Sequence, residues 1–379
     1  MAEIPLSLYL HFPWCVRKCP YCDFNSHAAQ GEIPEAAYID ALLRDLDFEL
    51  REPESRPLTS IFMGGGTPSL FSGAALGRLL EALAARLNFA PDIEITLEAN
   101  PGTVDAGNFR AYRAAGINRL SIGVQSFDPG QLRRLGRIHS RDDAVDAVAI
   151  ARAAGFDNIN LDLMFALPQQ TPAEAEADLR AALALAPEHL SYYQLTLEPN
   201  TEFAARPPKL PDDDSAWAMQ LAGQDLLAAQ GYVQYEVSAY AQAGYQSRHN
   251  RNYWQFGDYL GLGAGAHGKR SFANGIVRRA RHKLPRIYLE RAGNASVLQE
   301  VRSVGSVELP FEFAMNALRL NEGFSLDQFV ERTRLPASAI AATVARLQQR
   351  GLLECGDAQV VATALGRAHL NTLLAEFLE

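Results

Sequence analysis

The sequence contains few cysteines, no excess of positive charge and no long apolar run. Only four of its 379 residues are cysteine, and three lie within eight positions, which excludes a disulfide framework spread along the chain. Lysine and arginine number 35 against 44 acidic residues, a net charge of −9 that argues against a nucleic-acid coat or a polybasic membrane binder. No segment has the uninterrupted apolar length of a membrane span. The start lacks the charged segment and cleavage site of a secretory signal, so we expect a cytoplasmic protein.

Short strand-like runs alternate with helical segments through the first two-thirds of the chain. Six such βα repeats predict a parallel sheet with crossover helices, either an open barrel or a doubly wound sheet. Polar and apolar residues alternate along most of these runs, whereas a parallel strand covered on both faces should be apolar throughout. We therefore predict a partial (β/α)6 barrel of the TIM type with a polar lumen. The predicted strands are residues 6–11, 60–63, 93–98, 119–125, 158–164 and 190–197.

The remaining chain is expected to form two further parts after a barrel core at residues 1–240. Residues 241–303 form an extension that holds an HNxxYW motif at 249–254 and the glycine-rich turn GLGAGAHG at 261–268. Residues 304–379 show three short helices and a hairpin, a pattern typical of a small winged-helix-like α+β domain. That segment has no strong basic stripe, so we expect no nucleic-acid partner.

Cys15, Cys19 and Cys22 form a CxxxCxxC motif directly after the first predicted strand. Three thiolates in one loop can hold three irons of a 4Fe-4S cluster and leave the fourth iron open. Zinc is the competing metal, but a structural zinc site needs a fourth ligand and the chain has no second cysteine pair. The alternative without a metal is that the three cysteines are buried core residues that lie close together by coincidence. Cys355 lies alone, and we expect it to be a small buried apolar residue.

The cysteine motif and its neighbours resemble the radical S-adenosylmethionine superfamily. GGGTP follows the second predicted strand, and HFPWCxxxCPYCDF, EANP, SIGVQS, LGR and NLDLMFALPxQT resemble the oxygen-independent coproporphyrinogen III oxidase-like family over nearly the whole chain. The resemblance implies a 4Fe-4S cluster on the three cysteines and S-adenosyl-L-methionine at the open iron. It also implies a cofactor site made of Tyr9, Tyr21, Gly65, Gly66, Thr67, Glu98, Gln125, Arg137 and Asp162.

The residue types of that implied site suit the cofactor. Glu98 and Asp162 can accept hydrogen bonds from an amino group or from ribose hydroxyls, and Arg137 can pair with the methionine carboxylate. Alternation along the strands places Glu98, Gln125 and Asp162 on the lumen face, in agreement with the resemblance. For each acid alone, a solvated or capping carboxylate is the simpler interpretation.

Two departures separate this chain from the oxidase branch of the family. The oxidases carry a further cysteine two positions after the third, where this chain has Phe24, and a longer segment precedes their first cysteine. We therefore do not expect coproporphyrinogen III oxidase activity, although this oxidase and a radical enzyme with another substrate remain alternatives. Whether the protein is an enzyme stays open.

The HNxxYW motif resembles the haem-chaperone branch instead. This resemblance implies haem as a third cofactor, with His249 as an axial ligand and Tyr253 and Trp254 against the macrocycle. The alternative to a haem ligand is a structural histidine, with its hydrogen bonds made within a turn and two core aromatic residues beside it. The branch also implies an acceptor haemoprotein, and it leaves open a homodimer and a peripheral membrane contact through that acceptor. The basic run at 278–283 either pairs with haem propionates or is a solvated surface.

Overall fold

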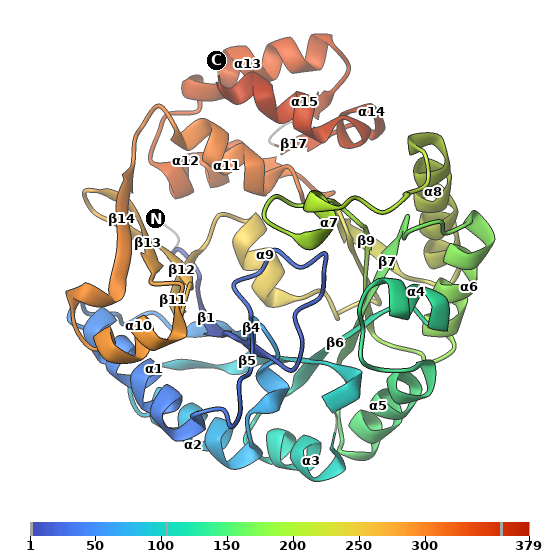
Figure 1. Cartoon of the computed structure of the whole chain (residues 1–379). Helices are drawn as coiled ribbons and strands as arrows, with labels where there is room; N and C mark the ends of the chain where they lie inside the picture. The colour runs from blue at the N-terminus through green and yellow to red at the C-terminus, as the bar shows by residue number, and fades with distance from the viewer. Residues whose placement is uncertain (1–2, 104, 357–358, 379) are drawn as a thin grey trace.

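One twelve-stranded sheet curves into an open ring and forms the framework of the protein (Figure 1). The computed structural model describes residues 3–103, 105–356 and 359–378. Six adjacent parallel strands confirm the predicted partial (β/α)6 barrel, and β11 (Asp258–Leu262) adds a seventh beside the first. The six are β1 (Leu6–Phe12), β4 (Leu58–Gly65), β5 (Phe89–Ala99), β6 (Arg119–Gln125), β7 (Ile159–Phe165) and β8 (His189–Gln194).

Antiparallel strands extend the sheet at both ends. β10 (Ala239–Ala241) and β9 (Val233–Glu236) follow β8, while β12 (His267–Phe272), β13 (Gly275–Arg281) and β14 (Leu298–Val304) follow β11. A turn at 237–238 connects β9 and β10, which pair as an antiparallel hairpin. The strands of segment 241–303 belong to the same sheet as the barrel strands.

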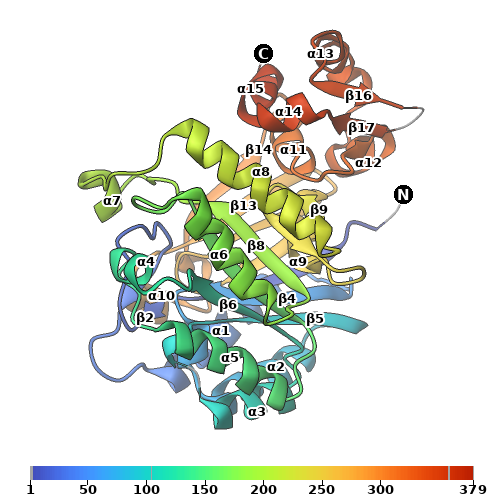
Figure 2. The ribbon, with the colours of Figure 1, turned by 90° about the vertical axis from the view of Figure 1, so that its right-hand side faces the viewer.

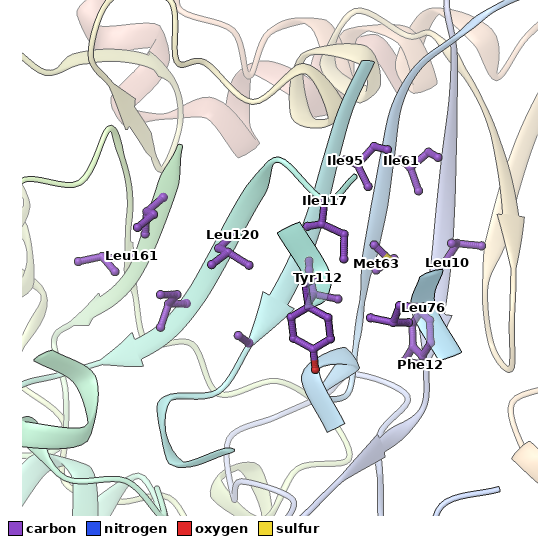
Figure 3. Packing of buried hydrophobic residues seen from close by; sticks show 14 of the residues in the cluster. Leu10, Phe12, Ile61, Met63, Leu76, Ile95, Tyr112, Ile117, Leu120 and Leu161 are labelled. Carbon is purple, nitrogen blue, oxygen red and sulfur yellow. The ribbon is translucent and has the colours of Figure 1, made fainter. Parts of the chain in front are cut away.

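Helices cover the outer face of the parallel strands (Figures 1 and 2). Apolar residues of the strands, including Leu10, Ile95 and Leu120, point toward Leu76 and Tyr112 on these helices (Figure 3). This packing confirms the predicted alternation, because the opposite residues of each strand face the lumen. The helices are α1 (Glu35–Glu49), α2 (Gly73–Ala84), α3 (Ala106–Ala114), α5 (Arg141–Ala153), α6 (Pro172–Leu183) and α8 (Asp213–Ala229).

A seven-residue helix, α9 (Arg248–Trp254), lies inside the ring and carries the HNxxYW motif (Figure 1). It packs on the lumen side of β1, β4 and β11. The predicted lumen is therefore not open throughout, because α9 fills the part of it beside β1, β4 and β11. The shorter elements are β2 (Trp14–Cys15), β3 (His27–Ala28), α4 (Pro129–Arg134), α7 (Glu202–Ala205) and α10 (Pro285–Arg291).

The C-terminal part has its own hydrophobic core and agrees with the predicted winged-helix-like pattern. Phe313 is its centre, with ring centroids 4.9 Å from Phe324 and 5.2 Å from Phe329. Cys355 lies exposed on strand β16, so the expectation of a buried residue is wrong. The elements are α11 (Leu309–Ala317), β15 (Phe324–Ser325), α12 (Leu326–Thr333), α13 (Ser338–Gln349), β16 (Leu353–Cys355), β17 (Gln359–Ala362), α14 (Ala364–Ala368) and α15 (Leu370–Ala375).

The three arginines of the basic run at 278–283 form ion pairs within the protein. Arg281 is 1% exposed, and its guanidinium pairs with Asp45 at 3.2 Å and with Glu49 at 2.5 Å. Arg278 pairs with Glu312 of the C-terminal part. The interpretation as a solvated surface is wrong for Arg281, because its acidic partners lie on α1, more than 230 positions earlier.

Among the described residues, no helix combines the length and the apolar character needed to cross a bilayer.

Candidate cofactor site

A cavity of about 340 Å³ lies at the carboxyl ends of the parallel strands. Its volume falls in the range of small-molecule sites, and this end of a parallel barrel is where ligands bind in such folds. It brings together eleven of the thirteen implied cofactor and metal residues. Its predicted lining residues are Cys15, Cys19, Tyr21, Cys22, Gly65, Gly66, Thr67, Glu98, Gln125, Arg137 and Asp162.

 The other two implied residues, Tyr9 and His249, lie elsewhere. Phe24, at the position of the further oxidase cysteine, also lines the cavity.

The three cysteines surround one side of the cavity as free, half-buried thiols. The Thr67 hydroxyl lies 3.5 Å from the sulfur of Cys15, and the Ser26 hydroxyl lies 3.7 Å from that of Cys22. Burial is the main cause that raises the pKa of Cys15 and of Cys22, so both thiols favour their protonated form unless a positive charge is near. Iron supplies such a charge, and this set of donors therefore fits an iron-sulfur cluster.

The arrangement of the cysteines also bears on the kind of metal. Among the residues that the structure describes, no three His, Cys, Asp or Glu side chains converge as the ligands of a single ion would. A 4Fe-4S cluster needs no such convergence, because each thiolate binds a different iron. Three thiolates along one side of a cavity are a donor set that such a cluster can use.

The glycines of the loop after β4 are required by close packing. The Gly65 backbone has a φ of +108°, and a Cβ there would lie 2.4 Å from the His11 ring. A Cβ on Gly66 would lie 2.5 Å from the carbonyl oxygen of Trp14. Any larger side chain would push this loop away from β1 and the cysteine segment, so the glycines hold the loop at the cavity edge.

Two carboxyl groups face the same cavity from β5 and β7, the strands on either side of β6. Burial, and then the negative charge of Asp162, raise the pKa of Glu98 to about 8, although the Gly65 N–H donates to the Glu98 Oε2 at 3.0 Å. Burial also raises the pKa of Asp162, against hydrogen bonds from Asn160 and other partners. Burial disfavours the charged form of both acids. A ligand that brings a cationic group or several hydrogen-bond donors would stabilise that form.

A cation faces the acids across the cavity. The Arg137 Nη1 lies 3.6 Å from the Cys19 sulfur, and Nη2 donates to the Gly123 carbonyl at 2.5 Å. Its Nε is buried without a hydrogen-bond partner, and no described carboxylate forms an ion pair with Arg137. A carboxylate on a ligand would satisfy this group. The cavity therefore suits a ligand that carries an ammonium group, a carboxylate and hydroxyls.

The strand β6 ends in a strained residue at the cavity. Gln125 has a φ of +70°, and its Oε1 accepts a hydrogen bond from the Tyr193 hydroxyl at 2.9 Å. The register between β6 and β7 shifts at this point. Non-glycine residues held at such angles are concentrated at ligand sites, so the strain agrees with the place of Gln125 on the cavity wall.

Tyr9 and His249 lie below the cavity rather than in its wall. The Tyr9 hydroxyl lies 3.0 Å from the His11 Nδ1, and the rings of Tyr9 and Phe62 stack against that of His249 at 6.2 and 4.7 Å. His249 is 3% exposed, and burial followed by the charge of Arg119 lowers its pKa to about 3. Its imidazole is therefore neutral, and its Nδ1 has no hydrogen-bond partner among the described residues.

The sequence analysis missed several residues of the cavity wall. Ser121, Ser191 and Tyr193 all line it. The alternation that placed Gln125 on the lumen face also places Ser121 there, and the same rule applied to β8 would have found Ser191 and Tyr193. Exposed apolar side chains at the mouth, such as Phe24 at 60% exposure, had no comparable signal.

Comparison with known proteins places this geometry in a class. The Radical SAM superfamily model matches residues 9–182, and the HemN C-terminal domain model matches residues 307–369. The solved coproporphyrinogen III oxidase (HemN) from Escherichia coli has a TM-score of 0.83, covers 99% of this chain and 90% of its own, and is 23% identical. That likeness shows the fold. The partial barrel with its cysteine-lined cavity is thus that of a radical S-adenosylmethionine protein, a class that implies a 4Fe-4S cluster and S-adenosylmethionine.

Curated relatives narrow the class to a family. A protein from Haemophilus influenzae named heme chaperone HemW is 50% identical over 380 residues, which cover 99% of this chain and 98% of that protein. The Escherichia coli protein of the same name is 50% identical over 376 residues, with the same coverage. The one from Bacillus subtilis is 34% identical over 379 residues, which cover 98% of this chain and 99% of that protein. This chain belongs to the HemW family.

Proposed function

We propose that the protein is a haem chaperone that binds haem, a 4Fe-4S cluster and S-adenosylmethionine, and that transfers haem to an acceptor haemoprotein. The single observation that carries this proposal is the identity of 50% over nearly the full length to relatives named heme chaperone HemW. The cysteine-lined cavity supports it, because its donors and charges suit the two cofactors that the superfamily implies.

The residues of the cavity have different roles in the proposed binding of the cluster and of S-adenosylmethionine. Cys15, Cys19 and Cys22 would hold the cluster, and its open iron would leave a place for S-adenosylmethionine. Arg137 pairs with the cofactor carboxylate, since its Nε has no hydrogen-bond partner among the residues that the structure describes. Glu98 accepts from a donor group of the cofactor. The bound cluster supplies single-electron chemistry, and these side chains orient the cofactor beside it.

His249 is the proposed axial ligand of haem. Its ring is neutral, and among the described residues its Nδ1 has no hydrogen-bond partner, so this nitrogen is free to bind iron. The ring is nevertheless 3% exposed and packs between Phe62 and Tyr253, at centroid distances of 4.7 and 4.4 Å. Ligation therefore requires α9 to move away from β4, and haem binding is coupled to the position of this helix.

A transfer assay tests the proposed function. The anaerobic, cluster-loaded protein is filled with haem and mixed with a haem-free b-type cytochrome in the presence of albumin, which captures haem that dissociates. We expect the cytochrome to gain haem despite the albumin, because the haem passes directly between the proteins. Loss of all haem to albumin would contradict transfer. Conversion of coproporphyrinogen III by the same preparation would support the oxidase instead.

A further inference from the structure

A chain of buried hydrogen bonds runs from the cofactor cavity to the start of α9. It begins at Asp162, whose Oδ1 accepts from the Asn160 Nδ2 at 2.8 Å. The Asn160 Oδ1 lies 2.6 Å from the His189 Nδ1, and the His189 Nε2 lies 2.9 Å from the Tyr235 hydroxyl. The Tyr235 hydroxyl accepts from the backbone N–H of Ser247 at 3.3 Å. Residues of β7, β8 and β9 thus connect the cavity wall to the residue that precedes α9.

The hydrogen bonds of Asn160 fix the direction of this chain. Its Nδ2 donates both to Asp162 and to the Ser121 hydroxyl, each at 2.8 Å. Its Oδ1 accepts from the Ser191 hydroxyl at 3.1 Å and faces His189. An amide oxygen can only accept, so the proton of the His189 imidazole resides on Nδ1.

The rest of the chain follows from that tautomer. With its proton on Nδ1, the His189 Nε2 accepts from the Tyr235 hydroxyl, and the Tyr235 oxygen accepts from Ser247. Every bond therefore donates toward Asp162, an arrangement in which neighbouring hydrogen bonds strengthen one another. Burial, and then the charge of Arg119, lower the pKa of His189 and keep its ring neutral, as the chain requires.

The far end of the chain holds the first turn of α9. The Ser247 hydroxyl accepts from the Asn250 N–H at 3.3 Å and caps the helix. The Glu94 Oε1 accepts from the N–H groups of Arg248 at 3.0 Å and of His249 at 3.3 Å. Tyr235 and Glu94 are thus the two side chains that fix the start of the helix that carries His249.

We propose that His189 is a positioning residue that couples the Asp162 carboxylate on the cavity wall to the start of α9, so that a ligand bound at Asp162 orders this helix. The inference rests on the proposed function in one respect, the binding of S-adenosylmethionine in the cavity. A ligand that donates to Asp162 fixes this side chain and Asn160 with it. The same chain then fixes His189 and Tyr235 and reduces opening of α9.

A consequence for haem follows from the burial of His249. Its ring reaches an iron only when α9 moves, so a cofactor that orders α9 disfavours haem ligation by His249. S-adenosylmethionine and haem then bind with negative coupling, and by reciprocity haem lowers the affinity for S-adenosylmethionine by the same factor.

Hydrogen–deuterium exchange of residues 248–254 tests the coupling without haem. The cluster-loaded protein is compared with and without saturating S-adenosylmethionine, as the parent chain and as the Tyr235→Phe variant. This variant keeps the ring packed beside His189 and removes only the hydroxyl of the chain. Tyr240→Phe is the matched control, since Tyr240 is a buried tyrosine on the adjacent strand β10, outside the chain.

We expect S-adenosylmethionine to slow exchange in residues 248–254 at least threefold in the parent and in Tyr240→Phe. In Tyr235→Phe, at equal saturation with the cofactor, the factor by which S-adenosylmethionine slows exchange should be less than half of the parent's factor. His189→Phe should abolish it, and His189→Gln should restore part of it, because glutamine can donate and accept one hydrogen bond each. A merely structural defect would raise exchange equally with and without the cofactor.

The contrary results are distinct. An unchanged α9 in the parent at saturation, or equal slowing in the parent and Tyr235→Phe, would overturn the coupling even if the protein binds and transfers haem. A parent that binds no haem would overturn the chaperone proposal, while slowing that depends on Tyr235 would still support the coupling. Failure of the parent to bind S-adenosylmethionine would overturn both the cofactor site and the coupling.

Discussion

Arg137 donates a hydrogen bond to the sulfur of Cys19, with Nη1 and Sγ 3.6 Å apart. The two residues are 118 positions apart in the sequence, and the fold brings them together at the edge of the cavity. One guanidinium therefore borders both a proposed cluster ligand and the space proposed for S-adenosylmethionine. In the proposed assignment, cluster and cofactor therefore share one site.

The cluster ligands are tested by iron content. After anaerobic reconstitution the parent should hold about four irons per chain, as a cubane cluster requires. Replacement of Cys15, Cys19 or Cys22 by Ser should remove most of this iron. Cys355→Ser is the control, because Cys355 is exposed and belongs to the C-terminal part. Equal iron loss in all four variants would contradict the assignment.

The charged residues of the cavity are tested by cofactor affinity. Arg137→Ala and Asp162→Ala each remove a charge-assisted hydrogen bond, worth about 1.5–3 kcal/mol, or on the order of tenfold to a hundredfold in Kd. Iron content should stay at the parent level in both. Arg134→Ala serves as control, since Arg134 is an exposed arginine of the same segment. Parent-like affinity in Arg137→Ala and Asp162→Ala would show that the cofactor binds elsewhere.

The pKa of Glu98, about 8, predicts a pH dependence of stability in the ligand-free protein. The folded state holds the Glu98 proton up to about pH 8, whereas the unfolded state loses it near pH 4.3. Between these values the free energy of unfolding falls as pH rises, by on the order of 1 kcal/mol per pH unit. Denaturant unfolding at several pH values should show a smaller fall in Glu98→Gln. The exposed Glu290→Gln should match the parent, and identical curves for all three proteins would refute the burial argument.

The alternation of polar and apolar residues along the strands predicted most of the barrel fold. The run Arg119–Gln125 matches β6 at both ends, because its alternation is local and its apolar face packs under the helices. Cys355 was misjudged because its exposure depends on the position of β16 at the edge of a small sheet. The buried Arg281 was misjudged because its partners on α1 lie far away in the sequence. Local patterns specify the faces of an element but not the long-range partners of its charged residues.

The cavity wall was predictable where it follows from alternation, as at Glu98, Gln125 and Asp162. The position of His249 was not, since a seven-residue segment carries too little periodicity to show that it is a helix inside the barrel. The chain through His189 could not be predicted either, because single hydrogen bonds join β7, β8, β9 and the residue before α9. Such contacts depend on the assembled sheet.

The buried ion pairs of Arg281 predict a large loss of stability when the cation is removed. Arg281→Ala leaves the buried Asp45 without its ion-pair partner and removes one of the arginines that pair with Glu49, and such a loss costs roughly 3–5 kcal/mol in the free energy of unfolding. Arg78→Ala is the control, because Arg78 pairs with Asp40 at the surface and such pairs contribute about 0–1 kcal/mol. Denaturant unfolding measures both, and similar losses for the two variants would contradict the buried network.

The central claim is that this chain binds haem through a residue of α9, apart from the cluster. The most direct test is an anaerobic haem titration of the cluster-loaded parent, of His249→Ala and of His369→Ala, followed at the Soret band. His369 is an exposed histidine of the C-terminal part and serves as the control. Iron content and S-adenosylmethionine binding are measured on the same preparations.

We predict saturable binding of about one haem per chain in the parent and in His369→Ala. In His249→Ala the affinity should fall at least tenfold and the Soret maximum should shift, because the iron loses its proposed ligand. Cluster content should be equal in all three proteins. A parent without a saturable Soret band would contradict the account, and a His249→Ala titration identical to that of the parent would contradict the assignment of the ligand to α9.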